Sequence, residues 1–261
     1  MVKSKSLEEW GSRTAKGGFS IERFVEGKFK DWKNQSLAKD WLKKMGYSIE
    51  NIKNVHAKRV SGGKADVNVY VEIDEKVKVE RISIKKIDED ANYNQLDKRW
   101  INHYQKLWDM PRNIVEGLKM FTGEVGFRPS ELIKKGKEIN TRRLRNGRRL
   151  YLTEMEPEIS RAILIFFRTN KDRILEDLIK GRGDQSADWL MVAMLKNDGT
   201  MAWAVKRIDE AIRIFGEGGV EISNKGNLHI GRIIVQRKGG NAGRDTAQML
   251  QFKINPKDLF D

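Results

Sequence analysis

Apolar residues recur along the N-terminal half of the chain with two different periods. Residues 19–46 show helical spacing in two pieces, and Gly46 is a natural stop for the second piece. Residues 49–61 and 65–87 alternate between apolar and polar positions and are rich in β-branched side chains, which predicts strands. Residues 95–122 return to helical spacing. This half of the chain therefore combines helices with a sheet.

The C-terminal half shows the same mixture after a less regular stretch. The pattern predicts helices over residues 157–180 and 207–215. It predicts strands over residues 188–196, 201–206, 219–224, 228–237 and 249–254. Together the two halves indicate a mixed α/β fold in which helices pack on sheets.

The first predicted hairpin carries charged residues within an otherwise apolar pattern. Alternation sends the apolar side chains of residues 67–73 to one face and Asp66 to the other. With the turn at residues 75–76, antiparallel pairing sets Asp66 directly opposite Lys85, and Ser83 lies on the same face. Directly opposed side chains have Cβ atoms roughly 4.5–5.5 Å apart, so the two charges would share one small site.

A carboxylate beside a lysine on a sheet face has two interpretations. One is a cross-strand ion pair of little energetic weight. The other is phosphodiester hydrolysis, in which the aspartate would hold a hard divalent cation. The lysine would then orient water and stabilise the charge that develops in the transition state. The residue pattern alone leaves both interpretations open.

The charge of the chain favours a polyanionic partner. Lys and Arg number 51 against 37 Asp and Glu, a net charge of +14. This excess favours nucleic acid, and a positive surface scattered for solubility is the alternative. The absence of cysteine excludes disulfides, thiolate metal sites and cysteine nucleophiles, and it fits a reducing cytoplasm. No apolar run approaches the roughly 20 residues of a bilayer span.

A strongly basic segment marks the best candidate boundary between two parts of the chain. Residues 134–149 hold eight basic residues and one acid, Glu138. We expect an exposed loop that neutralises phosphates, and a mobile positive loop without a partner is the alternative. The boundary would separate residues 1–130, which include the hairpin, from residues 131–261, and we expect the two parts to be subdomains of one compact unit.

An aspartate followed by a lysine on the neighbouring strand resembles the core motif of the PD-(D/E)xK nucleases. The resemblance extends over nearly the whole chain to the HinP-type restriction endonucleases, small type II enzymes that cut GCGC. It rests on the stretches GSRTAKGGF, WKNQSLAKDWLKKMG, NQLDKRWINHYQKLW and GRGDQSADWLMVA, and most specifically on residues 231–261. It implies a restriction-endonuclease-like α/β fold, a mixed β-sheet core flanked by helices. Residues 1–130 would be the catalytic half and residues 131–261 the DNA-recognition half.

The resemblance also implies catalytic residues and a cofactor, Mg²⁺. Asp66 matches the metal-binding aspartate and Lys85 the catalytic lysine. Ser83 falls where the motif has Asp or Glu and where the most similar relatives have an amide, which leaves the second metal ligand open. Glu22 matches an acidic residue that many members of this fold aim at the metal, and a solvated helix residue is the alternative.

Two stretches are candidate DNA contacts. In the first, a predicted strand ends in Gln236, Arg237 and Lys238, and a glycine turn leads to Asn241 and Arg244. Such side chains can meet base edges in the major groove, and glycines allow a close approach of the backbone. A solvated basic loop is the alternative.

The second stretch, NYNQLDKRW, follows the hairpin closely. Gln95 and Lys98 lie at a predicted helix start, near the position expected for the scissile phosphate. A plain helix cap by Asn94 is the alternative.

The function implied is a magnesium-dependent type II restriction endonuclease that acts on double-stranded DNA, at GCGC or a close relative. We expect a monomer or weak dimer in the bacterial cytoplasm, with a cognate DNA methyltransferase as a functional partner. A sequence-specific DNA-binding protein that lacks cleavage activity is the alternative that Ser83 keeps open. A structure-specific repair nuclease or an RNA nuclease on the same core is more distant.

Overall fold

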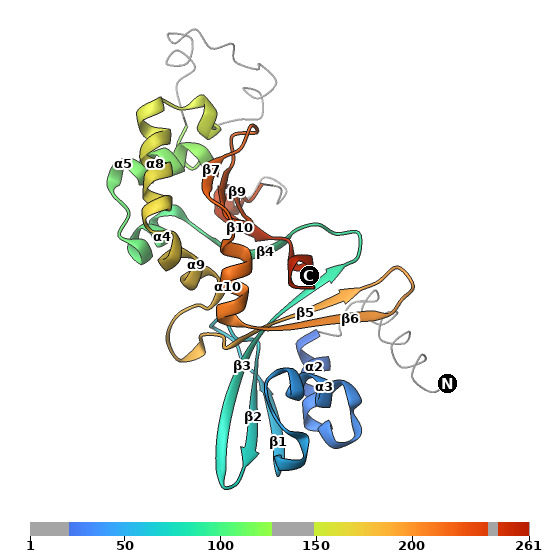
Figure 1. The fold of residues 1–261 in the computed structure, drawn as a ribbon. Helices are drawn as coiled ribbons and strands as arrows, with labels where there is room; N and C mark the ends of the chain where they lie inside the picture. The colour runs from blue at the N-terminus through green and yellow to red at the C-terminus, as the bar shows by residue number, and fades with distance from the viewer. Residues whose placement is uncertain (1–20, 127–148, 240–244, 261) are drawn as a thin grey trace. The chain divides into compact units, whose positions relative to one another are not determined.

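The protein divides into two compact units that alternate along the chain. The computed structural model describes residues 21–126, 149–239 and 245–260 (Figure 1). Unit 1 comprises Met1–Asn94, Leu175–Phe215 and Asn255–Asp261, and unit 2 comprises Gln95–Ile174 and Gly216–Ile254. The sequence predicts a single boundary near residue 130, whereas the chain passes from one unit to the other several times. Whether the two units divide catalysis and recognition between them stays a prediction.

Unit 1 is built on a five-stranded mixed sheet with the order β1-β2-β3-β5-β6. The central pair, β3 and β5, is parallel, and the remaining pairs are antiparallel. The strands are β1 (Asn54–Arg59), β2 (Val67–Ile73), β3 (Lys76–Asp88), β5 (Trp189–Leu195) and β6 (Met201–Arg207). All five correspond to strands that the alternation of apolar residues predicts.

The turn of the β2–β3 hairpin sets the register of the sheet. Asp74 and Glu75 form it with positive φ values of 51° and 66°, and Ile73 pairs with Lys76. Two consecutive residues with positive φ suit a tight two-residue hairpin turn, because its twist matches that of the strands. The sequence predicts the turn one residue later, at residues 75–76. That difference of one residue moves the partner of each β2 residue by two positions on β3.

Helices α2 (Ile21–Lys30) and α3 (Ser36–Lys44) cover one face of this sheet. Their apolar sides are buried, with Phe29 and Trp41 at most 1% exposed. They share one core with the inward residues of the strands, among them Val67, Ile82 and Met191. Burial of these side chains drives the assembly, at about 1.5–3 kcal/mol for each large apolar side chain.

Unit 2 contains a second five-stranded sheet, in the order β4-β10-β9-β8-β7. Its strands are β4 (Asn94–Arg99), β7 (Val220–Ile222), β8 (Leu228–Ile230), β9 (Ile233–Arg237) and β10 (Leu250–Ile254). Helices α4 (Ile101–Trp108), α5 (Arg112–Thr122) and α8 (Pro157–Thr169) belong to this unit. On β10, the Phe252 ring packs edge-on against Tyr104 and Trp108 of α4, with ring centroids 5.2 and 5.6 Å apart.

Three predicted elements differ from the structure. Residues 94–99 form a strand, so Gln95 and Lys98 lie in β4 and the helix begins only at Ile101. The pairing of β4 with β10 comes from the far end of the sequence, which local spacing does not contain. The predicted strand over residues 228–237 is two strands, because Gly231, with φ of 55°, turns the chain between β8 and β9.

The predicted long helix over residues 157–180 is interrupted. Asn170 separates α8 from α9 (Lys171–Ile179), and its side-chain amide donates to the carbonyl oxygen of Phe166 at 2.9 Å. The remaining helix is α10 (Ile208–Gly216), and short 3-10 turns include Pro256–Leu259 near the C-terminus. Within the described parts of the chain, no helix has the length and apolar character to cross a membrane.

Candidate active site

Asp66 lies immediately before β2, where the ladder with β3 ends. Its backbone N–H donates to the carbonyl oxygen of Ile82 at 2.8 Å. Its carboxylate Oδ2 accepts a hydrogen bond from the backbone N–H of Ile84 at 2.6 Å and a longer one from Ser83 Oγ at 3.4 Å. The carboxylate is therefore fixed against the backbone of β3 by a short charge-assisted bond.

Ser83 and Lys85 are on one face of β3, because side chains alternate along a strand. Ser83 is fully buried, and Lys85 is half-buried. Their neighbours on the parallel strand are Leu190 and Val192. Within the described chain, the Lys85 ammonium has no hydrogen bond or ion pair. A half-buried cation without a carboxylate partner is available to a bound anion.

The register corrects one detail of the predicted site. The ladder ends where Val67 pairs with Ile82, and the Asp66 carboxylate contacts Ser83 Oγ and the Ile84 N–H rather than Lys85. Among the described residues Asp66 and Lys85 form no ion pair, which removes the simple cross-strand pair as an explanation for the two charges. Lys85 lies two residues further along β3, on the same face as Ser83.

Glu22 occupies the first turn of α2 and is half-buried. Ile21 and Val25 of this helix pack in the core with Ile82 and Ile84, on the sheet face opposite Ser83 and Lys85. The hydrogen bonds of the Asp66 carboxylate go to β3. A role for Glu22 at a shared metal site therefore stays a prediction.

A buried carboxylate on the opposite face holds β3 in place. Glu80 is 3% exposed and accepts hydrogen bonds from the Tyr47 hydroxyl and, at 2.7 Å, from Trp189 Nε1. Lys78 Nζ lies 2.8 Å from Glu80 Oε1. Burial, followed by the hydrogen bond and the negative charge of Glu80, raises the pKa of Tyr47. Glu80 thus ties β3 to β5, and it faces away from Asp66 as the alternation predicts.

The loop before Asp66 is also packed closely. A Cβ atom on Gly181 would lie 2.6 Å from Lys64 Cβ, and Gly181 has φ of 82°. Only glycine allows both this conformation and this approach without strain. On the other side of Asp66, the Asp188 carboxylate accepts from the backbone N–H of Arg81 at 3.0 Å, which joins β3 to the start of β5.

The predicted DNA contacts within unit 2 fall into two groups. Gln95 of β4 and Gln236 of β9 are half-buried, and the side chain of Gln251 on β10 donates to Gln95 Oε1 at 3.0 Å. Lys98 is exposed. Arg237 and Lys238 are half-buried at the end of β9. Asn241 and Arg244 lie outside the described residues, as does most of the basic segment 134–149.

Arg237 has a second arginine near it. Its Nε donates to the carbonyl oxygen of Ala247 at 3.0 Å. Arg149 stacks on the Tyr151 ring, 4.1 Å from the ring centre, and Tyr151 in turn packs against Gly226. Gly226 lies in the turn between β7 and β8, two residues before Leu228, which pairs with Val235 of β9. Burial, and then the positive charge of Arg149, lowers the pKa of Arg237.

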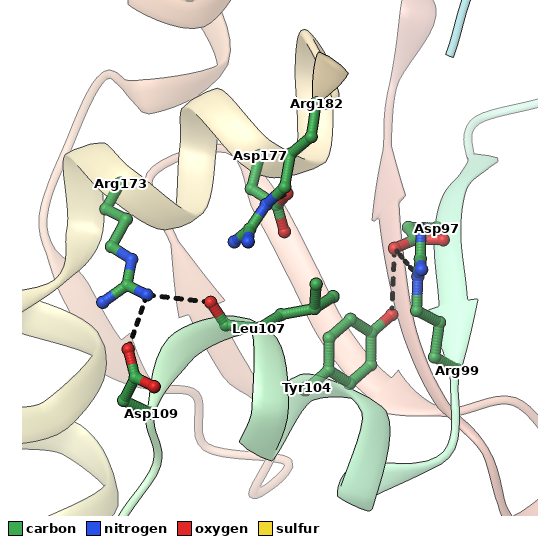
Figure 2. A network of polar contacts seen from close by, with 8 residues as sticks. All are labelled: Asp97, Arg99, Tyr104, Leu107, Asp109, Arg173, Asp177 and Arg182. Carbon is green, nitrogen blue, oxygen red and sulfur yellow. Dashed lines mark hydrogen bonds and ion pairs between the residues drawn. The ribbon is translucent and has the colours of Figure 1, made fainter. Parts of the chain in front are cut away.

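A polar network anchors the helices beside β4 (Figure 2). Asp97 accepts from the Tyr104 hydroxyl at 3.3 Å and pairs with Arg99 at 3.0 Å. Arg173 donates to Asp109 and to the carbonyl oxygen of Leu107, both at 2.8 Å. These contacts satisfy the charged groups around α4, so this cluster is structural.

Comparisons with known proteins assign the chain to a family. Residues 45–260 match the R.HinP1I restriction endonuclease family. The chain belongs to that family. It is therefore a type II site-specific deoxyribonuclease, and duplex DNA is its partner.

Among solved structures, the endonuclease is similar to one described as the crystal structure of restriction endonuclease MspI in complex with its cognate DNA. The TM-score is 0.58 at 13% sequence identity, and the match covers 89% of this chain and 87% of MspI. At this identity the likeness shows the fold, which confirms the predicted mixed α/β class. Among curated protein sequences there is no match.

Members of such families generally use a divalent metal, and the donors at Asp66 fit one. Asp66 Oδ1 accepts no hydrogen bond from the described part of the chain, so one hard oxygen is left for a cation. Mg²⁺ is usually bound by one or two carboxylates, with water and substrate phosphate completing its shell. Within the same residues, no cluster of three or more His, Cys, Asp or Glu side chains forms a larger metal site.

Sequence reasoning missed two residues of the endonuclease that the structure brings to candidate sites. Gln251 is an amide at a strand position with 6% exposure, and its only sequence signal is a polar residue inside the buried run LQFKI. Tyr151, whose ring stacks with Arg149, lies two residues after the basic segment. Nothing in the sequence indicates that it packs against Gly226.

Proposed function

We propose that this endonuclease hydrolyses phosphodiesters of duplex DNA at a site formed by Asp66, Ser83 and Lys85, with Mg²⁺ as its metal. The observation that carries the proposal is the fixed Asp66 carboxylate on the same sheet face as Lys85, a cation without a carboxylate partner in the described chain. By family resemblance, the DNA site is GCGC or a close relative.

Each residue of this site has a defined task. Asp66 Oδ1 would hold the metal, while its Oδ2 keeps the bond to the Ile84 N–H that sets the orientation of the carboxylate. When bound, Mg²⁺ polarises the phosphate and lowers the pKa of water. Lys85 would orient the attacking water and stabilise the negative charge that develops on phosphorus oxygens. In-line attack breaks the bond to the 3′ oxygen and leaves a 5′-phosphate and a 3′-hydroxyl.

Serine at position 83 is compatible with this chemistry. It donates to Asp66 Oδ2 through a long bond of 3.4 Å, and it is fully buried. The Ile84 N–H provides the shorter bond to the same oxygen, so the orientation of the carboxylate does not depend on residue 83. A second carboxylate is not required, because Mg²⁺ is often bound through one.

Recognition would involve unit 2. Gln95, Gln236 and Arg237 carry groups that can meet base edges, whereas Lys98 and Lys238 would contact phosphates. Arg149 beside Arg237 adds a second guanidinium, and a phosphate or a guanine edge would relieve the repulsion between the two cations. Asn241 and Arg244, which come after β9 in sequence, are kept as proposed DNA contacts on the grounds of their residue type.

Among the described residues there is one such site, so a double-strand cut would need two molecules or two successive events, by a monomer or a weak dimer. A methyltransferase that modifies the same DNA sequence would protect the host genome.

The test is a digest of plasmid DNA by the wild type and Asp66→Asn, with Mg²⁺, with Mn²⁺ and with EDTA. We expect discrete fragments only for the wild type with metal, and sequencing of their ends should map every cut to one short site. Asp66→Asn can still accept from Ile84 N–H, so it should fold and bind the same DNA without cutting. Binding without cleavage by the wild type in both metals would support the alternative, a DNA-binding protein without nuclease activity.

A further inference from the structure

Three glutamines from separate parts of the sequence lie side by side on adjacent strands of unit 2. The strand order is β4-β10-β9, and these strands carry Gln95, Gln251 and Gln236. Gln251 and Gln236 are direct partners in the antiparallel register, so their side chains share one face. Gln95 joins them through its hydrogen bond from Gln251 Nε2 at 3.0 Å. We call these three residues the amide row.

The middle member has an unusual environment. Gln251 is 6% exposed, and its Oε1 is buried without a hydrogen-bond donor in the described part of the chain. A buried polar atom that lacks a hydrogen-bond partner lowers the free energy of unfolding by about 1–3 kcal/mol, so such atoms are rare in native proteins and call for an explanation. The neighbour across the ladder, Gln236, makes no side-chain hydrogen bond within the described residues. Directly opposed Cβ atoms are roughly 4.5–5.5 Å apart, which brings the Gln236 amide within reach of this oxygen.

The hydrogen bonds available to the row fix which end of each outer amide remains unused. The side-chain oxygen of Gln95 accepts the hydrogen bond from Gln251, so the Nε2 group of Gln95 remains available as a donor. Gln236 can satisfy Gln251 only by donating its Nε2, which leaves its own Oε1 as an acceptor. A glutamine amide can normally present either its NH₂ donor or its oxygen acceptor to a ligand. In this arrangement each outer glutamine can present only one of the two.

We propose that Gln251 is a positioning residue for base recognition, and that it fixes Gln95 as a hydrogen-bond donor and Gln236 as an acceptor toward the DNA. This inference rests on the proposed function and deepens it. In the major groove, guanine presents the acceptors N7 and O6, and cytosine presents the amino donor at N4. A fixed donor and a fixed acceptor on neighbouring strands therefore suit a guanine and a cytosine. Gln251 acts through its neighbours and need not touch the DNA.

The experiment compares Gln251→Met with the wild type in two assays. Methionine keeps the length of the side chain but removes both hydrogen-bonding groups. The first assay measures equilibrium binding with Ca²⁺ to the duplex that end-mapping identifies, and to duplexes with one base pair replaced. The second measures their cleavage with Mg²⁺. Gln105→Met, a half-buried amide on α4, is the matched control, and thermal unfolding reports on folding.

For Gln251→Met we expect the preference for the identified site to fall by about tenfold or more at one or two base pairs. Binding to unrelated DNA should stay unchanged. Adding Gln95→Met should reduce the preference no further, because the two residues act as a unit. Gln105→Met should keep the wild-type preference.

An unchanged preference in Gln251→Met, or an equal loss of binding to all duplexes, would overturn the inference while the proposed function stands. If Gln251→Met does not fold, Gln95→Met and Gln236→Met must each lose the preference, and retention by either overturns the inference. A wild type that binds every duplex equally would refute the proposed sequence specificity, and the inference with it.

Discussion

The side chain of Asp66 bonds to the backbone N–H of Ile84 at 2.6 Å, just beyond the last ladder pair of β2 and β3. A carboxylate oxygen thus takes the place of a strand carbonyl at the end of the hairpin. The sheet itself therefore sets the direction of the proposed metal ligand. Because the donor is a backbone group, no substitution at position 84 except proline removes it.

Ser83→Ala should leave most of the cleavage activity intact. The substitution removes only the 3.4 Å bond to Asp66, while the shorter bond from Ile84 stays. We expect a loss of less than about tenfold in kcat, since the bond removed is long and weak. Single-turnover cleavage of the identified duplex measures this. A loss as large as that of Asp66→Asn would show that the Ser83 hydroxyl takes part directly in the chemistry.

Lys85→Met should slow cleavage strongly with little effect on stability. The ammonium has no partner in the described chain, so its removal breaks no ion pair, and we expect unfolding to change by less than about 0.5 kcal/mol. A group that stabilises transition-state charge is worth about 10²–10³ in kcat. Cleavage kinetics and urea unfolding of the same preparation test both parts. Lys86→Met, at the next position of β3, serves as the comparison.

Arg149→Gln and Arg237→Gln should each weaken DNA binding, and the salt dependence of binding distinguishes a phosphate contact from a base contact. If each arginine contacts a phosphate, the slope of log K against log [salt] should decrease by roughly 1 for each substitution. Arg112→Gln is the control, because that side chain is 89% exposed and pairs with Glu116 on its own helix. Titrations at several salt concentrations measure the slopes. A loss confined to the identified site, with an unchanged slope, would instead assign the arginine to a base.

Tyr47 should make the protein less stable at alkaline pH. Its pKa is raised in the folded state, by burial first and then by Glu80. Above the ordinary value of about 10, the unfolded chain releases this proton while the folded protein retains it. The folded state then binds more protons, so the free energy of unfolding falls as pH rises.

The check on this prediction is urea unfolding between about pH 8 and pH 11. Tyr47→Phe should be less stable than the wild type at neutral pH by about 1–3 kcal/mol, because the buried Glu80 loses a donor. Its further loss of stability above pH 10 should be smaller than that of the wild type. Tyr93→Phe, at a 52% exposed position, should follow the wild-type curve. Parallel curves for Tyr47→Phe and the wild type would contradict the assignment.

Gly181→Ala should impair cleavage more than backbone strain alone explains. The new methyl group would lie 2.6 Å from Lys64 Cβ and displace the loop that leads into Asp66. Gly199→Ala is a close match, since φ is 81° against 82° and nothing lies within 4 Å of the added atom. Both variants should lose about 1–2 kcal/mol of stability from the left-handed conformation. Equal kcat values for the two variants would show that the Lys64 contact does not reach the site.

The sequence predicted most strands and the first helices because their apolar periods are clear. It misplaced the hairpin turn by one residue, since neither Asp74 nor Glu75 is a glycine and the left-handed turn has no strong local signal. That error put Asp66 opposite Lys85, whereas the Asp66 carboxylate contacts Ser83 Oγ and the Ile84 N–H. The sequence also predicted a helix at Gln95, because its partner strand lies far along the chain.

The sequence could not predict the amide row or the proximity of Arg149 to Arg237, because both depend on contacts between distant segments. Their members are distant in sequence and meet only through strand order and register. Gln251 is surrounded by apolar neighbours, so a single-sequence analysis gives it no special chemistry. Asp66 and Lys85 became catalytic candidates because they are close in sequence, within one predicted hairpin, and resemble a family motif.

The alternation of the two units along the chain has a consequence for synthesis of the enzyme on the ribosome. β3 ends at Asp88, and its parallel neighbour β5 begins at Trp189, so one edge of β3 remains unpaired while about a hundred further residues are translated. The 3-10 turn Pro256–Leu259 packs against β5 and β6, so it also reaches its place only after these strands have been made. The sheet that contains Ser83 and Lys85 thus stays incomplete during this interval, so the proposed site gains its full surroundings only after β5 has been made.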